Sequence, residues 1–379
     1  MRVLFWSGTF WPNIGGVEVL ASKLLPALRN RGYEYAVIAP KTPAELPDEG
    51  RYSGIPIYRF PFRNNLNERS IEHLMETRRK IAALKRAFAP DLVHINAVGI
   101  ENFFHLTTAG AHRVPALVTL HGKWASQADT VVKRTLVDAD WVVGCSAAIL
   151  EEGRKLAPEI ISRSCVIYNG LEAPSTPPAP LPFDPPRLLC LGRLAREKGF
   201  DLALSAFGAI LQRFPRARLV IVGDGLERGA LEKQAIHQGV SQAVEFIGWV
   251  PPAGVPDLIN SSTVVVMPSR QDSLPLVALE AALMGRPLVV TRVGGLPEIV
   301  EHKQSGLLVE SEDPNGLTNA LSFLLDHPDA AVRMGEAARR RVQTVFRWER
   351  HVEAYDALYR QLISENMPDG KRPCRLPAR

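Results

Sequence analysis

Short apolar runs recur along the chain, and each is followed, after a turn, by a longer segment whose apolar residues have helical spacing. The apolar runs predict buried strands at residues 2–6, 36–39, 92–95, 117–120 and 141–144, and then at 188–192, 219–222, 264–267 and 288–291. Strands that alternate with helices form parallel sheets with helices on both faces. The pattern therefore predicts an α/β protein built from doubly wound sheets.

A proline-rich segment, residues 172–186, divides the chain, because its prolines exclude both a helix and a central strand. The 379 residues are 46% hydrophobic, which is enough for two domains with separate cores. We expect an N-terminal domain over 1–171, this linker, and a C-terminal domain over 187–345. A last helix is expected over 346–365, and the tail 366–379 is Pro-rich, basic and expected to be disordered.

One segment runs from a β-branched strand through a tight loop into a helix and carries two carboxylates, Asp272 and Glu280. The unpaired N–H groups and the dipole of a helix start suit a phosphate or diphosphate at Ser273 and Leu274, and Pro275 fits the first helical turn. Two hydroxyl-binding carboxylates beside an anion-binding loop suit a nucleotide sugar. A helix cap at Asp272 and a solvated Glu280 would explain the same residues equally well.

A second loop, which follows the strand at 188–192, carries two cations, Arg193 and Lys198. Doubly wound sheets bind ligands at the carboxyl ends of their strands, so both cations emerge where a diphosphate would bind. Arg supplies a bidentate fork and Lys a point charge. A basic loop by itself is more often solvated surface, but its combination with the Asp272 loop favours a binding site.

At the start of the chain, the strand at 2–6 leads through Gly15 and Gly16 into a helix predicted over 17–30. Adjacent glycines before a helix let the backbone approach a ligand closely. The three spaced glycines and the distal acid of the dinucleotide fingerprint are absent. On its own, this glycine pair is more often a turn than a site.

Together these elements resemble the retaining family 4 glycosyltransferases of GT-B fold. The resemblance rests on an ordered series of motifs that runs through most of the chain. The motifs are Gly15-Gly16-Val17-Glu18, Asp91 to His94, Thr119 to Gly122, Tyr168-Asn169-Gly170, Gly192-Arg193 with Lys198-Gly199, Gly223-Asp224-Gly225, Phe246-Ile247-Gly248, Asp272 to Glu280, Gly294 to Glu298, and Ser305 to Val309. Each motif is modest by itself, while their order and spacing are specific.

The resemblance implies two Rossmann-like doubly wound domains that face each other across a cleft, with the last helix crossing back to the first domain. It also implies which residues act. The implied catalytic residues are Asp272, His121, Arg193 and Lys198. The implied donor-binding residues are Gly15, Gly16, Arg193, Lys198, Gly223, Phe246, Gly248, Asp272, Ser273, Leu274, Leu276, Glu280, Gly294 and Gly295.

By the same resemblance, Arg193 and Lys198 meet the donor diphosphate and Glu280 binds the ribose diol. The position of Asp272 is usually Glu in the family and reaches the hexose hydroxyls. The shorter side chain retracts the carboxylate by about 1.5 Å, which is enough to alter the preference for the donor sugar. His121 closes over the sugar and phosphate from the other domain.

The implied reaction moves a hexosyl unit from a nucleotide-diphosphate sugar, most commonly a UDP-sugar, to a carbohydrate or lipid-linked acceptor in cell-envelope polysaccharide or glycolipid synthesis. Cations and amides at the diphosphate stabilise its developing charge without a cofactor. Retention implies that the acceptor attacks on the face from which the diphosphate departs. A phosphorylase or epimerase on the same fold and a non-catalytic partner of an active transferase remain alternatives. The acceptor depends on the loops Arg63 to Arg69 and Gly122 to Ala128.

The formal net charge is +5, and nine bases outnumber three acids between residues 51 and 88. An apolar stripe at helical spacing predicts a core-facing helix there, and the stripe comprises Ile71, Leu74, Met75, Ile81, Ala82 and Phe88. The basic opposite face suits either an anionic inner-membrane surface or ordinary solvation. We expect no nucleic-acid partner, because no recognition module accompanies the charge.

No apolar run reaches the roughly 18 residues of a membrane span, and Met1 leads directly into a strand, so we expect a soluble cytoplasmic protein. Scattered cysteines indicate reduced thiols rather than disulfides or a metal set, and they are Cys145, Cys165, Cys190 and Cys374. Asp138-Ala139-Asp140 spells a metal-binding triplet of another transferase class, but its place before a strand predicts a structural corner. Since the histidines His94, His105, His112 and His121 lack ligand spacing, we predict no metal.

Overall fold

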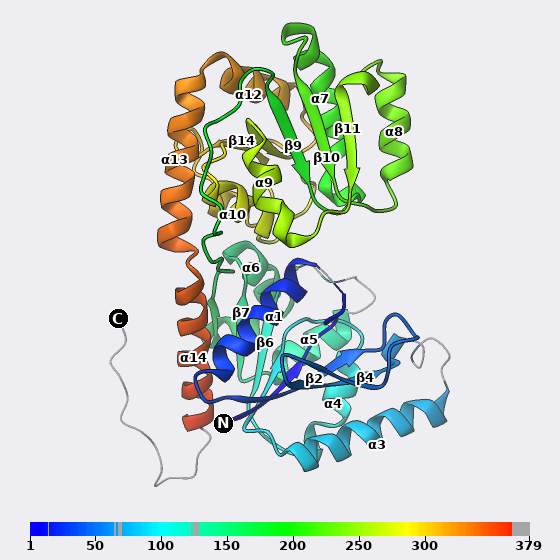
Figure 1. Cartoon of the computed structure of the whole chain (residues 1–379). Coiled ribbons are helices and arrows are strands. Elements are labelled where there is room, and N and C mark those ends of the chain that lie inside the picture. The colour runs from blue at the N-terminus through cyan, green and yellow to red at the C-terminus, as the bar shows by residue number, and fades with distance from the viewer. Residues whose placement is uncertain (14, 64–65, 67–69, 123, 125–128, 366–379) are drawn as a thin grey trace. The chain divides into compact units, whose positions relative to one another are not determined.

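The computed structural model describes residues 1–13, 15–63, 66, 70–122, 124 and 129–365. The chain divides into two compact units (Figure 1). Unit 1 comprises Met1–Tyr168 together with the chain from Arg350 onward, and unit 2 comprises Asn169–Glu349. The predicted disordered tail 366–379 lies outside the described residues, as do parts of the two predicted acceptor loops, Arg63 to Arg69 and Gly122 to Ala128.

Unit 1 contains an eight-stranded sheet with the order β3-β4-β2-β1-β5-β6-β7-β8. Its strands are β1 (Arg2–Trp6), β2 (Glu34–Pro40), β3 (Glu49–Tyr52), β4 (Ile55–Phe60), β5 (Leu92–Ile95), β6 (Ala116–Leu120), β7 (Trp141–Gly144) and β8 (Ser164–Val166). Its helices are α1 (Gly16–Arg29), α3 (Ile71–Phe88), α4 (Asn102–Thr107), α5 (Asp129–Asp138), α6 (Ala147–Leu156) and α14 (Trp348–Glu365). All neighbouring strands are parallel except β3 and β4.

Unit 2 contains a fully parallel six-stranded sheet with the order β11-β10-β9-β12-β13-β14. Its strands are β9 (Arg187–Leu191), β10 (Arg218–Val222), β11 (Val244–Gly248), β12 (Val264–Met267), β13 (Leu288–Thr291) and β14 (Leu307–Val309). Its helices are α7 (Phe200–Arg213), α8 (Arg228–His237), α9 (Val255–Asn260), α10 (Leu276–Leu283), α11 (Leu296–Ile299), α12 (Pro314–Asp326) and α13 (Pro328–Val345).

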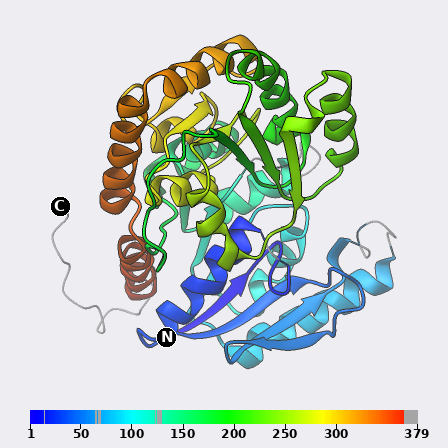
Figure 2. The same cartoon turned by 45° about the horizontal axis from the view of Figure 1, so that its top comes forward.

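Helices cover both faces of the sheet in unit 2. Helix α7 packs against α8 and α12, while α10 packs against α9 and α13 (Figure 2). Leu188 and Cys190 of β9 belong to the core formed with α7 and α12. Leu189, which is also buried, points to the other face because side chains alternate along a strand. The prediction of two doubly wound α/β domains is confirmed.

The predicted strands agree closely with the observed ones, and five of them, at 2–6, 92–95, 141–144, 264–267 and 288–291, have the predicted bounds. The antiparallel pair β3 and β4 at the edge of unit 1 was not predicted. β3 alternates exposed and half-buried residues and contains no buried position. The burial of β3 is too slight to give an apolar run, whereas β4 is mostly buried and its absence from the prediction is not explained in this way.

The proline-rich segment 172–186 contains no helix or regular strand, as its composition predicts. The structure places the change of unit earlier, between Tyr168 and Asn169, so that this segment lies within unit 2. The fully buried Arg286 holds it there by donating hydrogen bonds to the carbonyl oxygens of Ala179 and Pro180, the latter at 3.3 Å. Burial lowers the pKa of the Arg286 guanidinium to about 10.

Helix α14 groups with unit 1 because buried polar contacts join it to that sheet. The Tyr359 hydroxyl lies 2.6 Å from Nδ1 of His94 on β5, and the Tyr355 hydroxyl lies 3.0 Å from Oγ1 of Thr119 on β6. The hydroxyl of the buried Tyr33 also donates to Oδ1 of Asp356 at 2.7 Å. The last helix therefore completes the core of the N-terminal unit.

Helix α3 differs from its prediction. Its buried residues Thr77, Ile81 and Lys85 are four positions apart and form one narrow seam. Ile71 is 77% exposed and Met75 is 53% exposed, because they lie on another face of the helix. The prediction that the apolar stripe faces the core is therefore wrong for Ile71 and Met75.

Candidate functional site

The strand order of unit 2 reverses between β9 and β12, and the loops that follow these two strands meet at this switch point. Lys198, from the first loop, places Nζ 2.8 Å from Oδ2 of Asp272 in the second. The Ser269 hydroxyl donates to the same carboxylate oxygen at 3.0 Å. The ion pair is largely buried, since the side chains of Lys198 and Asp272 are 21% and 9% exposed. The structure thus brings together two of the predicted catalytic residues.

Two glycines permit the loops at this site to approach each other. Gly199 has a φ of +67°, and a Cβ there would lie 2.0 Å from the carbonyl oxygen of Pro268. Gly294 has a φ of +52°, and a Cβ there would lie 1.6 Å from the carbonyl oxygen of Asp272. The same oxygen accepts the N–H of Gly295 at 3.3 Å. Both positions require glycine, and the predicted residues Gly294 and Gly295 support the backbone of Asp272.

Helix α10 begins at Leu276, and Pro275 is its N-cap with φ −69° and ψ 129°. The prediction that Pro275 lies inside the first turn is therefore wrong by one residue. This conformation is still natural for proline, whose ring fixes φ near this value. Glu280 lies in the second turn and is half-buried, as are Ser273 and Leu276. The predicted diphosphate loop thus leads directly into the helix that carries Glu280.

Asn169 fixes this loop from the start of unit 2 and was not among the predicted site residues. Its Nδ2 donates to the carbonyl oxygen of Leu274 at 3.2 Å. Its Oδ1 is buried and has no hydrogen-bond partner within the described part of the chain. The side chain of Leu274 is 3% exposed, so the loop is anchored by both its backbone and its side chain. The Tyr168-Asn169-Gly170 motif was the signal that marked this position.

Arg193 lies at the same edge of the sheet but points elsewhere. Its Nη2 is 2.9 Å from Oε1 of Glu197, and its side chain is 71% exposed. Exposed pairs of this kind contribute little to stability, so rotation away from Glu197 costs little. Arg193 is therefore available to an anion at the switch point only after such a rotation.

The remaining residues predicted in unit 2 lie directly after β10, in the case of Gly223, or within β11, in the case of Phe246 and Gly248. The N–H of Gly223 donates to the carbonyl oxygen of Gly248 at 2.8 Å, which joins the two loops. Phe246 packs against the core of unit 2. The register between β10 and β11 shifts after the pair formed by Ile221 and Phe246. Ile247 and Trp249, which come after Phe246 in the sequence, are 40% and 58% exposed.

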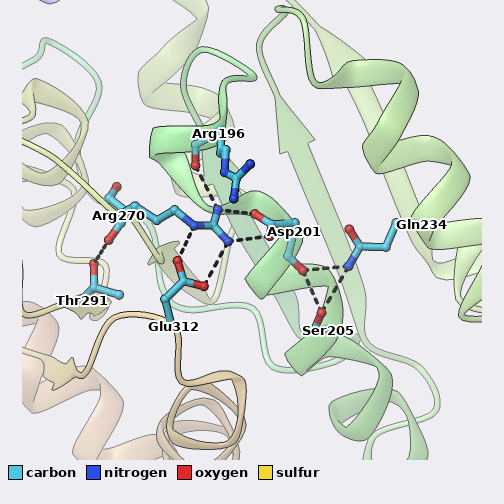
Figure 3. Close-up of polar contacts among 8 residues, drawn as sticks. Arg196, Asp201, Ser205, Gln234, Arg270, Thr291 and Glu312 are labelled. Atoms are coloured by element: carbon cyan, nitrogen blue, oxygen red, sulfur yellow. Dashed lines mark hydrogen bonds and ion pairs between the residues drawn. The ribbon is translucent and has the colours of Figure 1, made fainter. Parts of the chain in front are cut away.

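A cation that the sequence did not indicate, Arg270, crosses between the loops of this site (Figure 3). Its guanidinium binds the carboxylates of Asp201 and Glu312, and its pKa is raised chiefly by the hydrogen bonds to Asp201. The pKa of Asp201 is lowered because hydrogen bonds and the charge of Arg270 outweigh the opposing effect of burial. In the sequence, Arg270 is indistinguishable from other loop arginines because its partners are distant along the chain.

The residues predicted in unit 1 are Gly15, Gly16 and His121. Gly15 is the N-cap of α1 in an extended conformation, and Gly16 is the first residue of that helix. A Cβ at Gly15 would lie 2.5 Å from Oε2 of Glu18, whose carboxylate also accepts a hydrogen bond from Thr9. The glycine pair therefore begins a helix, as predicted, and Glu18 occupies the space beside it.

His121 follows β6, and its Nε2 lies 3.0 Å from Oδ1 of Asn96, which follows β5. Since an amide oxygen only accepts, Nε2 carries the proton and Nδ1 is left as an acceptor. Nδ1 of His121 and Nδ2 of Asn96 are buried without a partner among the described residues. Burial lowers the pKa of His121 to about 3, with a smaller contribution from His351, so the imidazole is neutral at physiological pH.

Other predicted features have structural roles. Asp138 pairs with Arg134 at 2.7 Å, and Asp140 accepts the N–H of Ala116 at 2.8 Å, which confirms the predicted structural corner.

Within the described ranges, no group of three His, Cys, Asp or Glu side chains could hold a metal ion. In the same part of the chain no helix is long and apolar enough to cross a membrane. Of the predicted reduced thiols, those within the described residues carry no disulfide.

Comparison with protein families matches both units. Residues 14–175 match the family described as Glycosyltransferase Family 4, and residues 176–341 match Glycosyl transferases group 1. The two matches meet near the division between the units, and together they span the loops that carry the predicted site residues.

Curated relatives give the same result. The chain is similar to a glycogen synthase of Mycobacterium tuberculosis, with 29% identity covering 95% of this chain and 94% of that protein. It is also similar to a D-inositol 3-phosphate glycosyltransferase of Corynebacterium urealyticum, with 37% identity covering 48% of this chain and 45% of that protein.

Solved structures share the fold. A sucrose-phosphate synthase of Thermosynechococcus elongatus superposes with a TM-score of 0.84 at 23% identity, covering 97% of this chain and 100% of that chain. Anabaena HepE, solved in complex with UDP-glucose, superposes with a TM-score of 0.77 at 19% identity, covering 96% of this chain and 100% of that chain.

Proposed function

Because the chain belongs to the family 4 glycosyltransferases of GT-B fold, which use nucleotide-sugar donors, we propose that it moves a hexosyl unit from a UDP-sugar to a carbohydrate or lipid-linked acceptor. We propose further that the transfer retains the anomeric configuration and needs no metal. The observation that carries this proposal is the ion pair of Lys198 and Asp272 at the switch point of unit 2. It combines a phosphate-binding cation with a hydroxyl-binding carboxylate.

The ammonium of Lys198 has three donors, so it can bind a diphosphate oxygen while it keeps Asp272. That arrangement would place the Asp272 carboxylate against the hexose and the cation against the leaving group. The amides of Ser273 and Leu274 and the fork of Arg193 would add donors at the diphosphate. Charge that develops on a departing diphosphate is stabilised most by donors that are already in place.

In the proposed reaction, the bond between sugar C1 and the diphosphate oxygen breaks, and its electron pair goes to that oxygen. The acceptor hydroxyl oxygen forms a bond to C1 on the same face. Its proton passes to the departing phosphate oxygen. No protein nucleophile takes part, and Lys198 and Arg193 hold the diphosphate throughout. The neutral His121, with an acceptor at Nδ1, suits a hydrogen bond from a sugar hydroxyl.

Two acceptor classes are supported by the relatives. Likeness to a glycogen synthase over nearly the whole chain supports a glucan acceptor and a glucosyl donor. Likeness over 43% of the chain to a phosphatidylinositol monomannoside mannosyltransferase of Mycobacterium tuberculosis, at 36% identity, supports a lipid-linked acceptor of the cell envelope. Incubation of the enzyme with each donor and with either maltooligosaccharides or a short-chain phosphatidylinositol monomannoside separates the two.

The first test is a thermal-shift titration against UDP-, GDP-, ADP- and dTDP-sugars, with and without a chelator. A ligand at about 100 times its dissociation constant stabilises the protein by about 2.7 kcal/mol. We expect stabilisation by UDP-sugars that the chelator does not alter. Stabilisation by another nucleotide class would correct the donor, and loss of binding with chelator would contradict metal independence. Proton NMR of the product, which distinguishes the two anomers, tests retention.

The same assays separate the alternatives. A phosphorylase would release a sugar phosphate when free phosphate replaces the nucleotide, and an epimerase would convert the donor sugar without an acceptor. A non-catalytic partner would show no turnover with any donor, and Asp272→Glu would not produce any. We expect turnover in the wild type and a changed donor preference in Asp272→Glu.

We also propose that unit 1 binds an anionic membrane surface through α3. The exposed residues Ile71, Met75 and Arg79 are four positions apart on one face, and Arg86 continues it. Apolar residues followed by cations on one helical face suit the headgroup region of a membrane.

Flotation with vesicles containing anionic lipid should recover the protein at low salt. Arg79→Glu should weaken recovery, and Arg113→Glu, at an exposed arginine outside α3, should not. Equal recovery with neutral vesicles would contradict the proposal.

A further inference from the structure

Arg270 joins four segments of unit 2 through one guanidinium, two residues before Asp272 (Figure 3). Its Nη1 and Nη2 each lie 2.7 Å from an oxygen of the Asp201 carboxylate at the start of α7. Nη1 also donates to the carbonyl oxygen of Arg196 at 2.9 Å. Nη2 donates to Oε2 of Glu312, after β14, at 3.2 Å.

The backbone of the same loop reinforces this connection. The N–H groups of Arg270 and Gln271 both donate to the carbonyl oxygen of Glu197, at 2.8 and 3.3 Å. Glu197 adjoins Lys198, so the two loops that carry the ion pair are joined within one residue of Lys198. The separation of Lys198 from Asp272 therefore depends on the contacts of Arg270.

The geometry requires arginine. The guanidinium presents two parallel N–H groups to Asp201, and lysine cannot form this bidentate contact. Ser205 and Gln234 donate to the carbonyl oxygen of Asp201, both at 2.9 Å, and the carboxylate is left for Arg270. The side chain of Arg270 is only 19% exposed, so its removal leaves two carboxylates facing each other without a cation.

We propose that Arg270 is a positioning residue for sugar transfer, which holds the loops after β9 and β12 so that Lys198 and Asp272 act on the same donor. The proposal rests on the proposed function. Arg270 does not itself contact the donor, and its effect reaches the reaction through Glu197, Asp201 and the backbone of its own loop.

The test compares Arg270→Met, Arg270→Lys and Asp201→Asn with the wild type. We expect kcat of Arg270→Met to fall roughly 30- to 100-fold, because misplacement by about 1 Å costs up to this factor. The donor KM should change less than about threefold, since the loops after β10 and β11 and Glu280 are not held by Arg270. Arg270→Lys should recover part of kcat, and Asp201→Asn should reproduce part of the loss.

Arg292→Met is the matched control. Arg292 follows β13 at the same edge of the sheet and pairs with Glu310 at 3.0 Å, but it does not join the two loops. We expect its kcat to be that of the wild type. A purely structural role for Arg270 would lower the melting temperature and leave kcat of the folded enzyme unchanged, and that result would overturn the proposal.

Hydrogen exchange separates this proposal from the proposed function. Amide exchange at Arg270 and Gln271 should become faster in Arg270→Met, whether or not a donor has been identified. A wild type that turns over no nucleotide sugar, combined with faster exchange in the variant, would overturn the proposed function and with it any positioning role in transfer. Unchanged exchange would show that Arg270 does not hold the loops after β9 and β12 together, and it would overturn the proposal.

Discussion

The switch points of the two units have the same topology but different chemistry. In unit 2 the order reverses between β9 and β12, where Lys198 and Asp272 form an ion pair. In unit 1 it reverses between β1 and β5, and Asn96 at the end of β5 holds the imidazole of His121. The fold fixes where the loops meet, and the loop residues decide what the edge can bind. Unit 2 presents charge that suits a diphosphate, while unit 1 presents a neutral acceptor.

The largest difference we predict between the two units is their response to acid. Burial lowers the pKa of His105 and His121 to about 3 and that of His351 to about 4, and it lowers that of His94 well below the usual value. The unfolded chain binds protons at these residues below about pH 6.5, and the folded unit does not. Stability is therefore complete above that pH and falls below it, by about 1.4 kcal/mol per histidine for each pH unit.

Unit 1 should therefore unfold first between about pH 6 and 4, because the three histidines described in unit 2, His237, His302 and His327, are exposed. Hydrogen exchange measured by mass spectrometry resolves the two units as the pH falls. His105→Leu should reduce the pH dependence in unit 1. Simultaneous loss of protection in both units would contradict this difference.

The next largest effect concerns charge at the switch point of unit 2. Lys198→Met should lower kcat about 100- to 1,000-fold, because it removes a preorganised donor from the leaving group. Steady-state kinetics with saturating acceptor measure the change. Lys155→Met, at an exposed lysine of unit 1, is the control and should have no effect. A loss of less than about threefold for Lys198→Met would mean that the cation is not used in transfer.

A third prediction concerns how closely the loops approach. Gly294→Ala should destabilise unit 2 by about 3 kcal/mol or more, because its Cβ would overlap the carbonyl oxygen of Asp272 at a positive φ. Gly110→Ala in unit 1 meets no atom within 4 Å and should change stability by less than about 0.5 kcal/mol. Urea denaturation of both variants gives the comparison. A fully stable Gly294→Ala variant with normal activity would show that the loop after β12 has room to move.

The positions of the two site loops of unit 2 could be predicted because residues close together in the sequence indicate them. Apolar runs located β9 and β12, and charged residues directly after them located Lys198 and Asp272. Arg270 escaped prediction because its partners Asp201 and Glu312 are 69 and 42 positions away, so that no local pattern marks the cluster.

The same limit explains the remaining differences. Nothing local indicates that Arg286 holds residues 172–186 within unit 2, since the contact spans more than 100 positions. A helical stripe also does not say which part of a helix is covered, and Ile71 was therefore misplaced. Lys85 shows the converse, because a lysine on a basic helix is expected in solvent and is instead buried.

That buried lysine gives the smallest of the predicted effects. Lys85 is 1% exposed, its Nζ donates to the carbonyl oxygen of His105 at 3.4 Å, and it lies 5.7 Å from the ring of Trp6. Burial lowers its pKa to about 7. Lys85→Met should stabilise unit 1 by about 1–3 kcal/mol at pH 7, because an apolar side chain of similar length replaces a buried cation that has no carboxylate partner among the described residues. Urea denaturation of unit 1 measures the change.

The pH dependence identifies the cause. The folded pKa lies below that of the unfolded chain, so the cost of burying Lys85 is greatest at or below pH 7 and shrinks as the pH rises toward about 10.5. The advantage of Lys85→Met should therefore be smaller at pH 9.5 than at pH 7. Lys80→Met, on the exposed face of the same helix, should change stability by less than about 0.5 kcal/mol at either pH. If Lys85→Met instead weakens unit 1, the contact of the ammonium with Trp6 outweighs its desolvation, and both units would then use buried cations to hold their loops and helices in place.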